Sequence, residues 1–268
     1  MIDAVFGRTR CALVGCVHLL PLPGSAGFTG DLDSVVQRAT EEARLLEKAG
    51  FNALIVENTH DAPYLLGQVD PETTAALAVC ARAVRETVKV PVGVQALAAA
   101  NREALGVAIA AGCSFIRVEN FAFAHVADEG LMATASAPEL IRVRARLRAE
   151  RILILADVKK KHASHAITAD LTMEDAVHGA AFSRADAVVV TGLATGKAAD
   201  LEDVRRARGP LPVFVGSGVT PANVAAYAAL ARGLIVGSTL KRDGDWKNEL
   251  DPERTAALVA AFRSSAPL

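Results

Sequence analysis

Polar and ionisable side chains in this sequence stand repeatedly at the ends of short apolar runs. The clearest cases are His18, Glu57, Arg117 and Asp157. Histidine transfers protons near neutral pH, and two carboxyl groups serve as general acid and general base where their surroundings separate their pKa values. Burying such groups is costly unless they pair with one another or with a ligand. The pattern therefore favours a catalytic site.

The candidate catalytic residues are Glu57, Asp157, His18, Lys159 and His162. Glu57 and Asp157 are interpreted as the acid–base pair, with Lys159 holding Asp157 ionised and the two histidines carrying protons. Further strand-end candidates for substrate binding are Asn58, Arg117, Glu119, Thr191 and Gly192. Structural alternatives stay open: a satisfied core histidine at position 18, a buried Glu57–Arg117 ion pair, a capping carboxylate at position 157 and solvated lysines.

Two glycine-containing turns near the carboxyl end of the chain indicate an anion site. One is the segment from Val215 to Pro221, and the other is the segment from Ile235 to Ser238. The candidate phosphate-binding residues are Gly216, Ser217, Gly218, Gly237, Ser238 and Lys241. Glycine lets backbone N–H groups approach an anion, a helix start adds a favourable dipole, and serine and lysine add a hydroxyl and a charge. Ordinary tight turns are the alternative.

The elements that position these residues are short apolar runs separated by amphipathic stretches. The runs are Ala12–Val17, Ala53–Val56, Val92–Val94, Phe115–Val118, Ile152–Ala156, Ala187–Val190, Pro212–Val215 and Leu234–Val236. The helical stretches are Leu32–Ala49, Glu72–Thr87, Arg102–Ala111, Ala137–Leu147, Met173–Ser183, Leu201–Arg208, Ala222–Leu230 and Glu253–Phe262. Continuous apolar runs are typical of strands covered on both faces.

Eight such units favour a single-domain (β/α)8 TIM barrel over residues 1–268. An open doubly wound sheet would place a phosphate loop of the form GxGxxG after the first strand, and His18–Gly24 contains none. In a TIM barrel the strand ends meet at one rim, so the candidates above would share one site.

Composition limits the classes of function. Hydrophobic residues make up 51% of the 268 residues, enough for a large core, and 29 Lys and Arg against 30 Asp and Glu give a net charge of −1. This balance argues against nucleic acid as a partner. The four cysteines are expected to be reduced core residues, and no apolar run reaches the length that membrane insertion requires. We therefore expect a cytoplasmic protein that forms a homo-oligomer.

Several long motifs resemble the BtpA family. They begin at Val17 (VHLLPLPG), Val56 (VENTHDAP), Ala156 (ADVKKKHA), Val190 (VTGLATG), Val215 (VGSGVT) and Ile235 (IVGSTLKRDG). The resemblance covers nearly the whole chain and implies a phosphate-binding TIM barrel. It adds Asp61 and Thr195 as candidate substrate-binding residues. It also implies two functional descriptions, a biogenesis factor for photosystem I and a sugar- or nucleoside-processing enzyme.

The sequence departs from the family pattern at two strand ends. Where the family usually has a motif like Leu-Arg-Asn-Asp, this chain has Leu97–Ala100, and where Arg-Val-Asn is usual it has Arg117-Val-Glu119. These changes indicate either a different substrate or a loss of activity, and the retained strand-end residues argue against loss. Asp128 and Gly130 also match the pattern and are expected on a long loop over the barrel mouth.

Three functions follow from these observations. The first is an enzyme that acts on a phosphorylated sugar or nucleoside by nucleosidase-like hydrolysis, lyase or isomerase chemistry. The second is a metal-assisted epimerase or hydrolase, in which His18, Glu57, Asp157 and His162 bind a divalent ion. No cofactor is certain from the sequence. The third is a non-catalytic biogenesis factor for a membrane complex of the photosystem I type.

Overall fold

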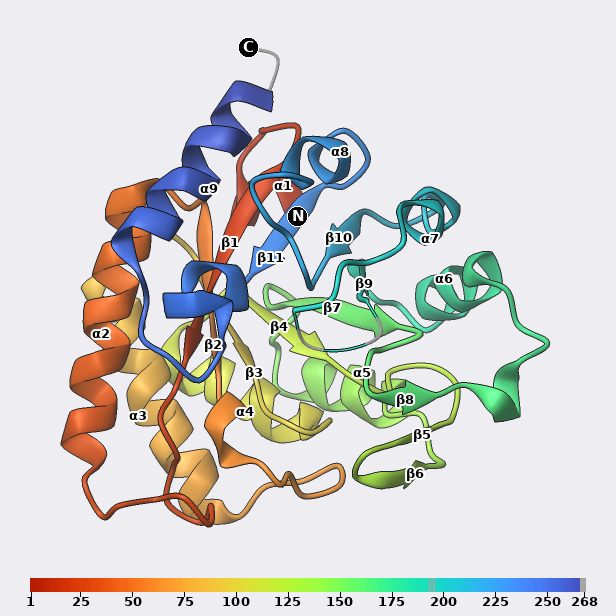
Figure 1. The fold of residues 1–268 in the computed structure, drawn as a ribbon. Coiled ribbons are helices and arrows are strands. Elements are labelled where there is room, and N and C mark those ends of the chain that lie inside the picture. The colour runs from red at the N-terminus through yellow and green to blue at the C-terminus, as the bar shows by residue number, and fades with distance from the viewer. Residues whose placement is uncertain (193, 195, 266–268) are drawn as a thin grey trace.

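A closed parallel barrel forms the centre of the protein (Figure 1). The computed structural model describes residues 1–192, 194 and 196–265. Within these residues the barrel order is β1-β11-β10-β9-β7-β4-β3-β2. The strands are β1 (Ala12–His18), β2 (Ala53–Glu57), β3 (Val92–Gln95), β4 (Phe115–Val118), β7 (Leu153–Val158), β9 (Ala187–Val190), β10 (Val213–Val215) and β11 (Gly233–Val236). The prediction of a TIM barrel is confirmed.

Helices follow the barrel strands and cover their outer faces. They are α2 (Leu32–Ala49), α3 (Pro71–Thr87), α4 (Asn101–Ala111), α5 (Ala137–Arg146), α6 (Met173–Phe182), α7 (Leu201–Arg206), α8 (Val224–Ala228) and α9 (Pro252–Ser265). Asp31 caps α2 by accepting a hydrogen bond from the Ser34 N–H at 3.0 Å, and Gly50 ends it at φ 106°. Among the described helices, none combines the length and hydropathy needed to cross a bilayer.

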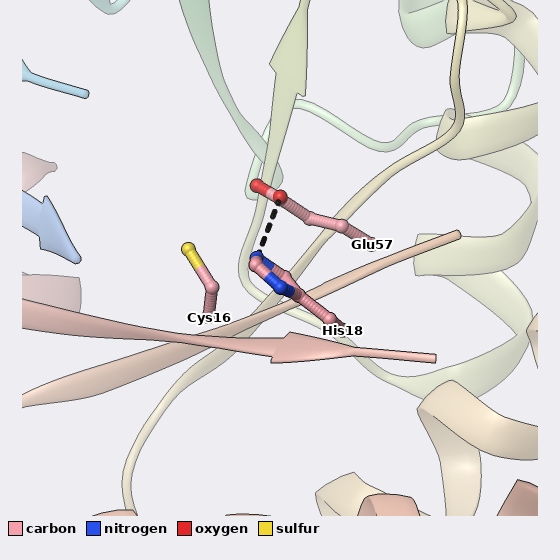
Figure 2. A group of neighbouring side chains, drawn as sticks. All are labelled: Cys16, His18 and Glu57. Atoms are coloured by element: carbon pink, nitrogen blue, oxygen red, sulfur yellow. Dashed lines mark ion pairs between the residues drawn. The ribbon is translucent and has the colours of Figure 1, made fainter. Parts of the chain in front are cut away.

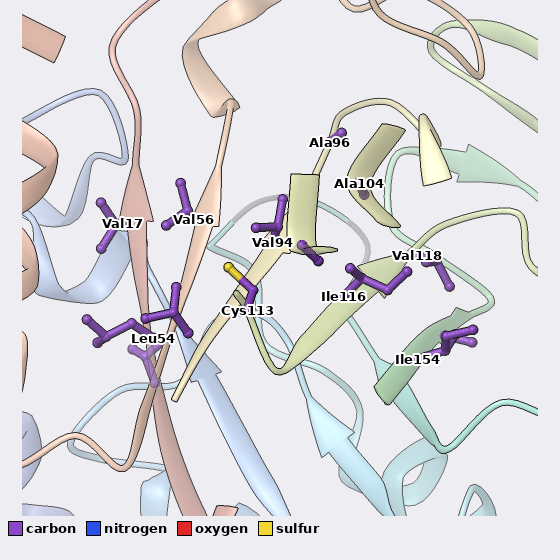
Figure 3. Close-up of a cluster of buried hydrophobic side chains, with 14 of the residues drawn as sticks. Val17, Leu54, Val56, Val94, Ala96, Ala104, Cys113, Ile116, Val118 and Ile154 are labelled. Carbon is purple, nitrogen blue, oxygen red and sulfur yellow. The ribbon is translucent and has the colours of Figure 1, made fainter. Parts of the chain in front are cut away.

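Alternation along the barrel strands divides the core into two parts. On β1, Leu13 and Val17 point outward and pack beneath the helices in one hydrophobic cluster. Figure 3 shows Val17 within this cluster. Ala12, Val14 and Cys16 point into the barrel. Because side chains alternate between faces, the next inward position on β1 is His18, at the carboxyl end of the strand. The same parity places the polar strand ends of the other strands at the barrel mouth.

The opposite end of the barrel is closed by a short helix, α1 (Ile2–Phe6), which the sequence analysis did not predict. The Phe6 ring lies 5.0 Å from the rings of both Phe115 and Phe214, measured between centroids. Gly93 provides the room, since a Cβ there would stand 2.2 Å from an atom of the Phe115 ring. A stack of aromatic rings therefore fills the barrel below the mouth.

Replacing Phe6 by alanine is expected to lower the free energy of unfolding by about 3–5 kcal/mol, because a fully packed ring is removed from between two others. Urea denaturation followed by circular dichroism measures this change. Phe182→Ala is the matched control, because the Phe182 side chain is 92% exposed and its loss should change stability little. Equal effects of the two substitutions would show that α1 does not close the barrel.

A small antiparallel sheet lies beside the barrel mouth and was also not predicted. It has the order β6-β5-β8, from β5 (His125–Ala127), β6 (Gly130–Met132) and β8 (Ala163–Ser164). The turn of the β5–β6 hairpin brings Asp128 to the mouth, as the sequence analysis expected. Short 3-10 turns complete the loops: η1 (Thr59–Asp61), η2 (Ala166–Thr168), η3 (Ser238–Leu240) and η4 (Arg242–Gly244).

Candidate active site

A cavity of about 590 Å³ opens at the carboxyl ends of the barrel strands. Cavities of this size hold small-molecule ligands, and in TIM barrels this end of the barrel carries the active site. The titratable residues that line it are Cys16, His18, Glu57, Tyr64, Arg117, Glu119, Asp128, Glu129, Lys160, Lys161 and His162. Many of the predicted strand-end residues therefore do share one site.

Arg117 is held in the mouth by Asp157. Its Nε and Nη2 atoms donate to the two carboxylate oxygens of Asp157 at 2.8 and 2.9 Å, and the Asp157 side chain is wholly inaccessible. The Nη1 atom of Arg117 lies 3.5 Å from Glu57. Asp157 therefore positions Arg117 and does not line the cavity, which corrects its interpretation as half of an acid–base pair.

The lysines after β7 point in three directions. Lys159 donates to the carbonyl of Leu171 at 2.6 Å and does not line the cavity, so the structure does not place it among the candidate catalytic groups as predicted. A φ of 45° at Lys159 ends the strand alternation. Lys160 pairs with Glu119 at 3.3 Å.

The third lysine, Lys161, replaces Lys159 as the candidate amine of the site. It lines the cavity, and Thr191 fixes its backbone by accepting from its N–H at 2.9 Å. Within the described residues, no hydrogen bond or ion pair engages the Lys161 ammonium, so this cation faces the space that a ligand would fill.

Burial shifts the pKa values of Lys161, Glu57 and His18 in the direction that favours the uncharged form of each group. It lowers the pKa of Lys161, and the neighbouring charge of Arg117 lowers it further. Burial also raises the pKa of Glu57 against the opposing pull of Arg117. The pKa of His18 falls well below its usual range, again mainly through burial. The shifts of Lys161 and Glu57 move their pKa values toward neutral pH, which suits proton exchange there, whereas the shift of His18 moves its pKa away from neutral pH.

Cys16, His18 and Glu57 bring three different donor atoms together (Figure 2). Their ligand atoms all lie within 4.8 Å of one another, and His18 Nε2 is 3.8 Å from Glu57 Oε2. The four metal ligands predicted from the sequence do not assemble, because Asp157 binds Arg117 and His162 lies 3.4 Å from Asp128. Cys16, which was interpreted as an ordinary core cysteine, joins His18 and Glu57 instead.

The two turns after β10 and β11 border the same cavity. Gly216, Ser217, Gly218, Gly237 and Ser238 all line it. In the part of the chain that the structure describes, the backbone N–H groups of Gly218, Gly237 and Ser238 have no hydrogen-bond acceptor. The Ser217 hydroxyl is already used, since it accepts from Gly192 N–H at 2.7 Å and donates to the Lys197 carbonyl at 2.8 Å. Backbone groups, rather than this hydroxyl, therefore provide the available donors.

Lys241 does not take part in this site. Its ammonium donates to both carboxylate oxygens of Glu42 on α2, at 2.7 and 2.8 Å, and the residue is fully buried. Lys241 is absent from the cavity lining, so its prediction as a phosphate ligand is not supported by its position. The pair instead ties the loop after β11 to α2.

Asn58 and Asp61 lie behind the cavity and join three loops. Asp61 accepts from the Leu22 N–H at 2.8 Å and from the Asn58 amide at 2.9 Å, and Asn58 accepts from the Leu97 N–H at 2.7 Å. They position the loops after β1, β2 and β3 rather than line the cavity. Among the remaining predicted substrate-binding residues, Arg117 and Glu119 line the cavity and Thr191 and Gly192 support it from behind, while Thr195 lies outside the described residues.

Some residues of the site were missed. Cys16 could have been found from strand parity, since it stands two residues before His18 on β1. Gln95, Tyr64 and Trp246 also line the cavity, and none was among the predicted site residues. Trp246 lies in the loop between β11 and α9, two residues beyond the IVGSTLKRDG motif.

Fold and site together define a TIM-barrel protein with a cavity at the carboxyl ends of its strands that is lined in part by titratable side chains. The chain belongs to the BtpA family, whose model matches residues 9–264. It is 37% identical to the photosystem I biogenesis protein BtpA of Synechocystis over 260 residues, covering 95% of this chain and 89% of that protein. It is 38% identical to a protein of Caenorhabditis elegans over 266 residues, covering 97% and 95%.

Solved structures with a similar fold have low sequence identity to this chain. Thiamine phosphate pyrophosphorylase from Pyrococcus furiosus superposes with a TM-score of 0.60 at 14% identity, covering 97% of this chain and 99% of that one. Tryptophan synthase from M. tuberculosis gives 0.59 at 21% identity, covering 98% and 96%. N-(5'-phosphoribosyl)anthranilate isomerase from P. furiosus gives 0.56 at 15% identity, covering 95% and 99%. These likenesses show the fold.

Proposed function

We propose that the protein is an enzyme that acts on a phosphorylated small molecule, a sugar phosphate or a nucleotide, by hydrolysis, lyase or isomerase chemistry. One observation carries the proposal. The unpaired N–H groups of Gly218, Gly237 and Ser238 border the same cavity as Glu57 and Lys161. An anion bound at the turns would therefore place the rest of its molecule against groups that can move protons.

The fold supports the phosphate end of this proposal. In TIM barrels the loops after the seventh and eighth strands commonly bind phosphate, and here these are the loops after β10 and β11. Two of the similar structures carry names of enzymes of phosphorylated compounds, thiamine phosphate pyrophosphorylase and phosphoribosyl anthranilate isomerase. The unpaired N–H groups are the feature of this chain itself that points the same way.

Each side chain at the other end of the cavity has a role in the proposed reaction. Lys161, with its lowered pKa, takes a proton from the substrate, and Glu57, with its raised pKa, gives one. Arg117 keeps its positive charge and stabilises negative charge that develops on the substrate between them. Asp157 acts through Arg117 and is a positioning residue.

A thermal-shift panel tests the proposal. A phosphorylated compound that binds should raise the melting temperature by about 5–10 °C at a hundredfold excess over its Kd, which corresponds to roughly 2.7 kcal/mol. The same compound without its phosphate should give no comparable shift. Ser238→Asp should abolish the shift, because it places a carboxylate beside the N–H groups. Ser264→Asp on the exposed surface of α9 should keep it.

Two outcomes would contradict the phosphate site. One is an equal shift with the phosphorylated and dephosphorylated compounds, and the other is a full shift in Ser238→Asp. Either would mean that the anion does not bind at the turn after β11.

The alternative function, a non-catalytic assembly factor, is favoured by one surface feature. Val126 and Leu131 face each other across the β5–β6 hairpin and are 40% and 55% exposed, and Ile167 in η2 is 55% exposed. Exposed apolar groups of this kind serve partner binding. An assembly factor would keep its partner in Lys161→Met and lose it in Leu131→Glu. An enzyme would lose its activity in Lys161→Met and keep it in Leu131→Glu.

A further inference from the structure

The three donors beside the cavity are fixed by regular strand geometry. Cys16 and His18 are two residues apart on β1 and therefore point to the same side of the strand. Glu57 on β2 is the register partner of His18. A thiol, an imidazole and a carboxylate thus converge within 4.8 Å, each on a buried residue and each at the cavity wall (Figure 2).

The surroundings of His18 favour a cation between His18 and Glu57. His18 Nδ1 lies 3.4 Å from the carbonyl oxygen of Trp246, an acceptor, so we assign the ring hydrogen to Nδ1. With the hydrogen on Nδ1, Nε2 is the ring atom with the free lone pair, and it faces Glu57 Oε2 at 3.8 Å. This distance is too long for a hydrogen bond, and a positive ion between the two atoms would bind both.

Two further features match metal-binding histidines. A ligating histidine usually donates its other ring N–H to a carbonyl or carboxylate, which is the role of Trp246 here. Gly237 also lies close to the ring, since a Cβ there would stand 2.8 Å from His18 Nε2 and 3.4 Å from Cys16 Cβ. A residue larger than glycine at this position would therefore push against His18 and disturb the donor set.

We propose that Cys16, His18 and Glu57 bind one divalent transition-metal ion, with Zn²⁺ as the best fit. A set of one sulfur, one nitrogen and one oxygen donor suits a borderline-soft ion and does not suit Mg²⁺ or Ca²⁺. Bond lengths of about 2.0–2.3 Å require the donors to move together by less than an ångström or so. Three protein ligands leave a fourth position, and the cavity lies beside it.

Binding of the ion releases protons. A thiol binds a metal ion as its thiolate, and a carboxyl group binds it as its carboxylate. The ion displaces the thiol proton to solvent as the metal–sulfur bond forms, and it displaces any proton that Glu57 carries. Metal affinity should therefore increase as the pH rises.

Nearby cations do not prevent this binding. Arg117 is neutralised by Asp157, and Lys241 is neutralised by Glu42, in both cases through a pair of short hydrogen bonds. Lys161 has a lowered pKa and can lose its own proton when a second positive charge arrives. The metal site goes beyond the proposed function and does not depend on it. Glu57 can give a proton only in the metal-free site. With the ion bound it would serve as a ligand, Lys161 would still accept the substrate proton, and the proton given to the substrate would come from another group.

Cobalt substitution tests the site without an assay of activity. The whole protein is treated with a chelator, and Co²⁺ is titrated while the absorption spectrum is recorded. One equivalent should produce the strong visible bands of a four-coordinate ion together with a near-ultraviolet charge-transfer band from a thiolate, and Zn²⁺ should remove both. Cys16→Ser should lose the charge-transfer band, and His18→Gln should weaken binding by about tenfold or more. The buried but distant Cys113→Ser is the matched control and should keep the complete spectrum.

The site is overturned if the wild-type protein gives no such spectrum, or if the charge-transfer band survives in Cys16→Ser. Should Cys16→Ser fail to fold by circular dichroism, His18→Gln decides, because unchanged Co²⁺ affinity in that variant also overturns the site. The rise in melting temperature with a phosphorylated compound, measured on the same preparations, tests the proposed function separately. A rise in melting temperature without cobalt binding would contradict the metal site alone. Cobalt binding without a rise in melting temperature would contradict the proposed function alone.

Discussion

Replacement of Asp157 by asparagine is expected to lower the free energy of unfolding by about 3–5 kcal/mol. Asp157 accepts two hydrogen bonds from Arg117 at 2.8 and 2.9 Å, in a position closed to solvent. Without this charge, Arg117 stays buried with Glu57 as its nearest carboxylate, at 3.5 Å. A buried charge that loses its partner keeps its full desolvation cost, whereas an exposed one does not. Urea denaturation measures the loss, with the m-value as a check on two-state unfolding.

The control for this prediction is an ion pair of similar length on the surface. Arg102 and Glu139 lie 2.9 Å apart with both side chains more than half exposed, so Glu139→Gln should cost less than about 1 kcal/mol. The double variant Arg117→Met with Asp157→Asn should recover much of the stability that Asp157→Asn loses, because it removes the unpaired charge as well. An equally small loss in Asp157→Asn and Glu139→Gln would show that Glu57 alone can neutralise Arg117.

The barrel could be predicted because one sequence pattern, a short apolar run followed by an amphipathic stretch, is repeated along the chain. Each strand is apolar at consecutive positions and buried on both faces, so the sequence pattern and the physical requirement coincide. The short elements had no such signal. Helix α1 has five residues and no side-chain cap, and its function in closing the barrel depends on Phe115 and Phe214 far along the chain. The strands of the β5–β6 hairpin have three residues each, too few for a periodic pattern.

The candidate site could be predicted only as far as the ends of apolar runs indicate it. Their position at the ends of apolar runs placed His18, Glu57 and Arg117 at the mouth, but it could not say which carboxylate binds Arg117, since that depends on the relative positions of neighbouring strands. Lys241 was assigned to the phosphate site because of its place in the chain, whereas its partner Glu42 stands 199 residues away. Partners this distant cannot be read from local spacing.

The lysines at positions 159–161, directly after β7, also show that local spacing could not predict where every side chain points. Alternation beyond β7 predicted that Lys159 would enter the cavity with Asp157. The positive φ of 45° at Lys159 breaks that alternation, turns its ammonium to Leu171 and leaves Lys161 at the cavity. The structure therefore places Lys161 at the cavity and not the predicted Lys159, and this difference determines which lysine the proposed reaction would use.

Lys161→Met is expected to lower the rate of the proposed reaction by about 100-fold or more, because it removes the group that accepts the substrate proton. The substrate is the phosphorylated compound that gives the largest thermal shift. Binding of that compound should change much less, since its phosphate lies at the turns after β10 and β11. Steady-state kinetics separates the two effects as a fall in kcat with a small change in KM.

The proposed role of Lys161 also predicts in which direction the rate changes with pH. Lys161 accepts a proton only when it is uncharged, so the wild-type rate should rise with pH through the pKa of this residue, and it should fall where Glu57 loses the proton that it gives. Burial and the neighbouring Arg117 lower the pKa of Lys161, which places the rising limb below the usual range of a lysine. In Lys161→Met this rising limb should disappear from the profile of the remaining activity.

Lys159→Met is the matched control, because it removes the same charge two residues away from an ammonium that donates to Leu171 outside the cavity. It should keep both the rate and the pH profile of the wild-type protein. If Lys159→Met loses as much activity as Lys161→Met, the loss reflects the charge or the fold of the loop after β7. If Lys161→Met keeps the rising limb, another group accepts the proton and the role given to Lys161 is wrong.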